Sequence, residues 1–280
     1  MSKIGPVSRR AVVKSSVFGL LAASLPCIAS SETKETLFHR YPSIDDAVAM
    51  EVVGASHFDL GKVKKLVTAR PELARATWDW GFGDWETAVG AASHVGRRDI
   101  ADFLIANGAR PDIFTFAMLG AFDAVKSIVE SKAGVQRIAG PHGISLLQHA
   151  RAGLRMEETL SEKQKGNCKG LISYLVSLGD ADSQDEYLEM EASTKDKYLG
   201  EYKFGNGAED GFNVSLNMRK LLSISRMGKF GGGGTLFQVG ENRFICNGTK
   251  TAEITFLMKN ESVASLTIHE PGLTLTAMRT

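Results

Sequence analysis

The chain has 280 residues, about twice the length of a typical domain, so two domains are expected. Its 43% hydrophobic and 23% charged residues are typical of a folded protein and exclude wholesale disorder or a collagen-like chain. The 33 basic and 32 acidic residues leave a formal net charge of +1, which argues against a general nucleic-acid binder. Three cysteines are too few for a disulfide scaffold, and they form no Cys-x-x-Cys zinc motif.

Residues 1–30 have the three parts of an export signal: a basic start, a short apolar centre and small residues near the end. The apolar run over residues 15–25 is about half as long as a membrane span, so no retained span is expected. Arg9 and Arg10 resemble the pair of a twin-arginine signal, which implies export of the folded protein. We therefore expect a periplasmic or secreted protein. A soluble N-terminal helix and a lipoprotein modified at Cys27 are the alternatives.

Residues 44–182 contain an internal repeat. The tripeptide Ala-Ser-His at residues 55–57 recurs at 92–94, a spacing of roughly 37 residues that lies within the range of helical repeats. Each copy is followed by a similar apolar run with helical spacing, at residues 63–67 and 100–104. The pattern predicts paired helices that stack along the chain.

The clearest copy has a helix start at residues 87–92, a turn at Gly96 and an Asn-Gly-Ala-x-x-Asp exit at 107–112. This order of features resembles an ankyrin repeat. The copy departs from that family at Ala88 and Gly90, where proline and histidine are usual. The resemblance implies a solenoid whose partners bind to its projecting fingers and to the adjoining concave face.

Three further copies are degenerate, which gives four ankyrin-like repeats over residues 44–182. The third copy, around Phe116, follows so soon after the second that its finger is missing, and the fourth starts at Gly143 and resumes at Gly170 after a charged insertion. One helix pair cannot bury its apolar stripe alone, so neighbouring pairs stack and share a core. Stacking of this kind supplies no catalytic group.

Residues 183–197 are predicted to form a partly helical linker, and residues 198–280 a β-rich domain. Alternation of apolar and polar residues predicts half-buried antiparallel strands; they are expected at residues 212–216, 222–225, 236–239, 254–256, 263–268 and 273–277. A hairpin turn is expected at residues 259–262. The predicted fold class is therefore multidomain α + β, an α-helical ankyrin-like repeat solenoid followed by a small antiparallel β-barrel or sheet.

The β-rich domain resembles the lipocalin-like domain that follows β-lactamase-like hydrolases. A small barrel is filled by its own side chains or holds one small ligand, and the filled interior is the simpler interpretation. If a ligand is bound, the expected cavity is lined by Phe212, Leu216, Phe237 and Phe244.

The most informative local feature is the aromatic finger, residues 78–85, which contains all three tryptophans. Exposed aromatic side chains beside an arginine are typical of a protein-binding hot spot. The residues predicted to bind a partner are Trp78, Trp80, Phe82, Trp85 and Arg75. The alternative is that these rings cover the open end of the repeat stack or pack against the β-rich domain.

No sequence pattern indicates catalysis, a metal or a cofactor. The histidines form no His-Glu-x-x-His motif, so no metal site is expected, and His57 and His94 are interpreted as serving the hydrogen bonding of their own repeats. Serine-nucleophile motifs are absent, and the glycines at residues 231–234 are interpreted as a hairpin loop rather than a phosphate loop. A hydrolase would need His142 or His149 in a cleft near a carboxylate and a serine.

The sequence therefore predicts a protein of the cell envelope that binds a protein partner and is not an enzyme, with no nucleic-acid partner and no cofactor. A small-ligand carrier that uses the barrel, and an accessory to an envelope hydrolase, are the alternatives. Cys168 and Cys246, which remain after signal removal, are expected to be buried free thiols.

Overall fold

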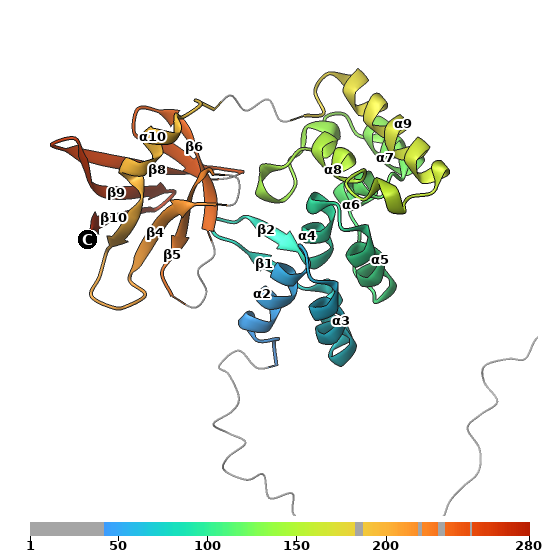
Figure 1. Cartoon of the computed structure of the whole chain (residues 1–280), viewed down its shortest axis with the longest axis horizontal. Helices are drawn as coiled ribbons and strands as arrows, with labels where there is room; N and C mark the ends of the chain where they lie inside the picture. Colours follow the sequence, from blue (N-terminus) through green and yellow to red (C-terminus); the bar gives the residue numbers. More distant parts are fainter. Residues whose placement is uncertain (1–41, 183–186, 218–219, 229–232, 247) are drawn as a thin grey trace, which may run out of the picture. The chain divides into compact units, whose positions relative to one another are not determined.

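The structure is a computed structural model, and it joins a run of helices to a closed barrel of antiparallel strands (Figure 1). The helices lie between residues 46 and 178 (the helical part) and the barrel strands between residues 200 and 279 (the barrel). The residues that it describes are 42–182, 187–217, 220–228, 233–246 and 248–280. The predicted α + β class is confirmed, and the predicted export signal at 1–30 lies outside the described residues. Among the described residues, no helix combines the length and apolar character of a membrane span.

The helical part consists mainly of short helices that follow one another in pairs. They are α2 (Asp46–Ala55), α3 (Leu60–Ala69), α4 (Ala88–Val95), α5 (Arg98–Ala106), α6 (Ile113–Met118), α7 (Phe122–Ser131), α8 (Leu146–Ala152) and α9 (Glu162–Leu178). Short 3₁₀ segments occur at Pro71–Arg75, Val135–Arg137, Pro141–Gly143 and Glu157–Thr159.

Local sequence signals explain where several of these helices begin and end. Thr87 and Ser145 each accept a hydrogen bond from a backbone N–H in the first turn of α4 and α8, as helix-capping residues do. Gly96 ends α4 with a φ of 78°, in the left-handed region that favours glycine. The helix α3 ends just before Pro71, because proline disfavours a helical conformation in the residue that precedes it.

Two apolar clusters hold the helical part together. The first joins α2, α3, α4 and α5 and includes the fully buried Val63, Ile100 and Leu104. The second joins α6, α7, α8 and α9 and includes the fully buried Leu146 and Leu171. No single pair of helices completes either cluster, so the pairs depend on their neighbours for burial.

The predicted aromatic finger, residues 78–85, is part of a two-stranded hairpin formed by β1 (Thr77–Asp79) and β2 (Trp85–Thr87). We call the whole hairpin the finger. Trp78 pairs with Glu86 across it. Its turn is closed by Asp79, whose Oδ1 accepts hydrogen bonds from the N–H groups of Gly81 (2.8 Å) and Gly83 (3.2 Å). The side chain of Asp79 therefore fixes the turn from within.

Eight strands close the barrel in the spatial order β10-β3-β4-β5-β6-β7-β8-β9. They are β3 (Gly200–Lys203), β4 (Gly211–Leu216), β5 (Leu222–Arg226), β6 (Gly233–Gly240), β7 (Arg243–Cys246), β8 (Thr249–Lys259), β9 (Ser262–Glu270) and β10 (Leu273–Arg279). Six of them contain the segments predicted as strands, while β3 and β7 are additional. The predicted turn at 259–262 is present, with positive φ at Asn260 and Glu261.

Between the two parts, the predicted linker contains a short helix, α10 (Ala192–Lys195), followed by the 3₁₀ segment Asp196–Tyr198. The buried core of the barrel combines aliphatic side chains with aromatic rings, several of which lie edge to face. Phe244 lies 5.1 Å from Tyr198 and 5.4 Å from Phe256 between ring centroids.

Cys168 and Cys246 are both buried thiols with no disulfide between them, as expected.

Candidate functional site

The finger carries the residues that the sequence predicts as a partner-binding surface, and the structure distributes them differently. Trp78 and Trp80 are partly buried and pack against the first apolar cluster of the helical part. Phe82 is partly buried and packs against the apolar cluster of the barrel. Trp85 has 62% of its surface exposed, and Arg75 is also exposed. Within this group, the exposed surface is therefore provided by Trp85 and Arg75.

The next residue of the finger, Glu86, points the opposite way and is fully buried. Successive side chains of a strand project to opposite faces, so an exposed Trp85 places Glu86 on the inner face. There the indole Nε1 of Trp80 donates a hydrogen bond of 2.7 Å to Glu86 Oε2. The other carboxylate oxygen, Oε1, has no hydrogen-bond partner among the described residues.

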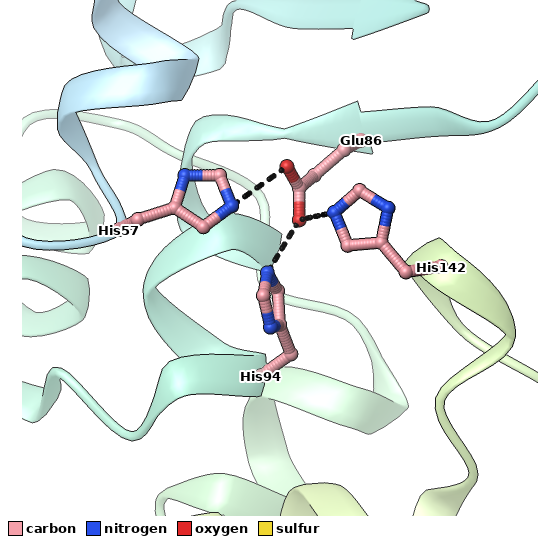
Figure 2. A group of neighbouring side chains, drawn as sticks. All are labelled: His57, Glu86, His94 and His142. Carbon is pink, nitrogen blue, oxygen red and sulfur yellow. Dashed lines mark ion pairs between the residues drawn. The ribbon is translucent and has the colours of Figure 1, made fainter. Parts of the chain in front are cut away.

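Three histidines surround this carboxylate (Figure 2). The Nε2 atoms of His94 and His142 lie 3.0 Å and 3.4 Å from Glu86 Oε1, and His57 Nε2 lies 3.4 Å from Glu86 Oε2. His57 follows α2, His94 lies in α4 and His142 lies in the 3₁₀ segment before α8. We call these four residues the histidine–glutamate cluster.

Two of the three rings are held in place by hydrogen bonds on their far side. His57 Nδ1 lies 3.1 Å from the carbonyl oxygen of Gly54, and a carbonyl can only accept, so Nδ1 carries the proton. His142 Nδ1 lies 2.7 Å from Asp84 Oδ2, and the backbone N–H of His142 donates to Asp84 Oδ1 at 2.8 Å. Asp84 thus holds both the ring and the backbone of His142.

The backbone of His142 has φ 58° and ψ 23°, in the left-handed region that residues other than glycine rarely occupy. Strain of this kind persists where the surrounding structure enforces it, and it is concentrated at functional sites. Here it accompanies the orientation that turns the ring of His142 toward Glu86.

Burial and charge act in opposite directions on the cluster. Burial alone raises the pKa of the Glu86 carboxyl, but the interactions with His142 and His94 outweigh it and hold the pKa well below its usual range. Burial lowers the pKa of His142, yet Asp84 and Glu86 overcome this and raise it to about 10. Burial lowers the pKa of His94. Glu86 is therefore a buried carboxylate anion that its histidine neighbours stabilise.

Sequence reasoning did not foresee this cluster. The repeated Ala-Ser-His signal identifies His57 and His94 as equivalent residues, but no motif links them to Glu86 or His142, which lie in separate segments. Of the hydrolase candidates, His142 contacts two carboxylates, whereas the Nδ1 of His149 meets the carbonyl oxygen of Ser145 at 2.9 Å. The hydroxyl of Ser145 donates instead to Asp182.

The four residues predicted to line a ligand cavity occupy different environments. Phe244 belongs to the buried core of the barrel, Phe212 packs at its edge and Leu216 is exposed. Phe237 stacks on Tyr187 with 4.2 Å between ring centroids. This pair lines a cavity of about 490 Å³, together with residues 188–190, Lys195, Leu221, Leu222, Leu236 and Gln238.

Comparison with protein-family models, curated proteins and solved structures gives no match for this chain. What the chain does is therefore inferred from its own residues.

Proposed function

We propose that this chain is an exported, non-catalytic protein of the cell envelope that binds a protein partner through an ankyrin-like repeat scaffold. Its paired helices, the finger between α3 and α4, and the glycine turns after α4 and α5 support this proposal. The signal-like sequence of residues 1–30 supports export to the periplasm or beyond. The partner surface that we propose consists of the finger, with Trp85 as its exposed aromatic residue, and the exposed Arg75, which precedes it in sequence.

The observation that supports the proposal is the exposed indole of Trp85, on a hairpin that hydrogen bonds hold in place. Trp85 has 62% of its surface exposed, while both of its neighbours in sequence are held. Asp84 is bound to His142, and Glu86 accepts the hydrogen bond of Trp80. A rigid aromatic side chain loses little conformational entropy on binding, which is why such residues often dominate binding energy.

The test compares Trp85→Ser with Leu257→Ser, because Leu257 is equally exposed, at 63%, but lies on the outer surface of the barrel. Both variants should keep the circular dichroism spectrum of the wild type, since surface substitutions change stability little. Wild type and Leu257→Ser should capture the same envelope protein, and Trp85→Ser should lose it. Equal capture by all three proteins would contradict the proposal.

A small-ligand carrier is a second candidate, favoured by the cavity beside Tyr187 and Phe237. Its size falls in the range of ordinary ligand sites. Because the barrel interior is packed with rings, the ligand would bind at this cavity and not in the centre. Phe237→Ala should then weaken binding of a fluorescent apolar probe, and an unchanged affinity would contradict this role.

A further inference from the structure

We infer that the histidine–glutamate cluster binds a single divalent transition-metal ion of the zinc class. His57, Glu86, His94 and His142 each offer one donor atom, and all four atoms lie within 4.8 Å of one another. Three imidazole nitrogens with one carboxylate oxygen form a donor set that suits Zn²⁺ and its first-row neighbours. Ca²⁺ and Mg²⁺ prefer sites made of oxygen alone.

Two of the separations between donor atoms are close to those of a tetrahedral site. Zinc bonds of about 2.0–2.1 Å place neighbouring ligand atoms about 3.3 Å apart. Glu86 Oε1 lies 3.0 Å from His94 Nε2 and 3.4 Å from His142 Nε2. His57 Nε2 lies 3.4 Å from the other carboxylate oxygen, and all four residues offer donor atoms within 4.8 Å of one another, so the side chains would have to draw together around a bound ion.

The donor atoms of the cluster face one another, but hydrogen bonds within the described residues do not satisfy all of them. Glu86 Oε1 and His94 Nε2 are both buried and, among the described residues, lack a partner in hydrogen-bond geometry, although they are 3.0 Å apart. His57 Nδ1 donates to the carbonyl oxygen of Gly54, so Nε2 is the ring nitrogen that faces the carboxylate. Buried polar atoms are normally paired, and one cation among the four donors satisfies them together.

The hydrogen-bond partners of the ligand side chains determine which of their atoms face the proposed ion. Gly54 holds His57 and Asp84 holds His142 through Nδ1, which leaves Nε2 directed inward. Trp80 occupies Glu86 Oε2, which leaves Oε1 as a single carboxylate ligand. Metal-binding histidines typically have such a carbonyl or carboxylate behind the ring, and it fixes the tautomer and orientation. The strained backbone of His142 serves the same orientation.

A metal ion at this site would have a role separate from partner binding, because it would join segments that are far apart in the sequence. Its ligands come from the end of α2, the finger, α4 and the segment before α8. A bound ion would therefore connect the end of α2, the finger and α4 to the segment before α8, and its binding energy would add to the stability of the fold.

The test measures zinc bound to the full chain after removal of metal with a chelator. Wild type should bind one Zn²⁺ per chain by titration calorimetry, and Co²⁺ in its place should give the strong visible absorption of a tetrahedral site. His94→Gln and His57→Gln should each weaken zinc binding at least about tenfold. The matched control, His269→Gln, changes an exposed histidine on β9 and should bind zinc like the wild type.

Circular dichroism checks that each variant folds, and thermal unfolding gives a second measurement. Zinc should raise the Tm of wild type and His269→Gln but not that of a folded His57→Gln/His94→Gln double variant. Wild type that binds less than one ion per chain, or variants that bind zinc as tightly as wild type, would overturn the inference. The cluster would then be an ion-pair network that fastens Glu86 within the fold.

Discussion

Adjacent residues of the finger have opposite surroundings, and this contrast defines the candidate site. Trp85 is exposed, whereas Glu86 is fully buried among three histidines and an indole. A carboxylate is costly to bury unless its charge and lone pairs are compensated. The compensating groups come from four separate segments, so the structure around Glu86 depends on the whole helical part.

His149 provides a pH test of a buried residue that is not one of the proposed ligands. Its side chain is fully buried against Phe114, its Nδ1 donates to the carbonyl oxygen of Ser145, and burial lowers its pKa to about 4. Between that value and the unfolded value of about 6.5, the unfolded chain binds a proton that the folded chain does not. The free energy of unfolding is therefore unaffected above about pH 6.5 and falls as the pH decreases toward 4, by about 3 kcal/mol in total.

The measurement is urea unfolding at about pH 7 and about pH 4.5, for wild type and His149→Gln. The variant should lose less stability between these two pH values, by about 2 kcal/mol or more. His269→Gln removes an exposed histidine and should keep the wild-type pH dependence. An identical loss of stability in wild type and His149→Gln would show that His149 does not carry the effect.

At the level of elements, two glycines show the difference between a turn that requires glycine and a helix position that does not. Gly96 ends α4 with φ 78°, and a Cβ atom there would lie 2.2 Å from the carbonyl oxygen of Ala152. Gly170 lies in α9, where a Cβ atom would meet nothing within 4 Å.

Gly96→Ala should therefore destabilise the protein by roughly 3 kcal/mol, from left-handed strain and a backbone clash. Gly170→Ala should stabilise it by about 0.5–1 kcal/mol, because alanine loses less entropy in a helix. Urea unfolding of both variants measures the difference. Equal effects of the two substitutions would mean that the contact between Gly96 and Ala152 is absent in solution.

Elements were predictable where a local pattern sets them. Alternation predicted six strands, and the polar residues at 259–262 predicted a turn there. The short strands β3 and β7 were missed because four residues give too little alternation. The two strands of the finger were not predicted either, because each has only three residues.

The candidate site could not be predicted, because its geometry depends on contacts between distant segments. Repetition marks His57 and His94 as equivalent, but nothing local distinguishes Glu86 from any exposed strand glutamate. His142 reaches the cluster only through a left-handed backbone that Asp84 stabilises from the finger. The prediction of no metal site therefore considered motifs alone, and the zinc titration is its test.

Over the whole molecule, the helical part and the barrel have separate apolar cores. All three tryptophans belong to the finger, so their fluorescence reports on the helical part. Phe244 is fully buried in the barrel between Tyr198 and Phe256.

Phe244→Ala should destabilise the barrel by about 3–5 kcal/mol, because the cavity it leaves cannot collapse fully. Hydrogen exchange of the strand amides should accelerate, while the unfolding curve followed by tryptophan fluorescence should stay as in wild type. Leu257→Ser, on the outer surface of the barrel, should leave both measurements unchanged. A fluorescence midpoint that shifts as far as the strand amides do would mean that the two cores unfold as one unit.

The order of strands in the barrel also has a consequence during synthesis. The last strand, β10, pairs with β9 and also with β3, which was made about seventy residues earlier. Until β10 has been made and has paired, β3 and β9 remain as two open edges that can pair with other chains. A product truncated before β10 should therefore aggregate, because only pairing with β10 covers both of these edges.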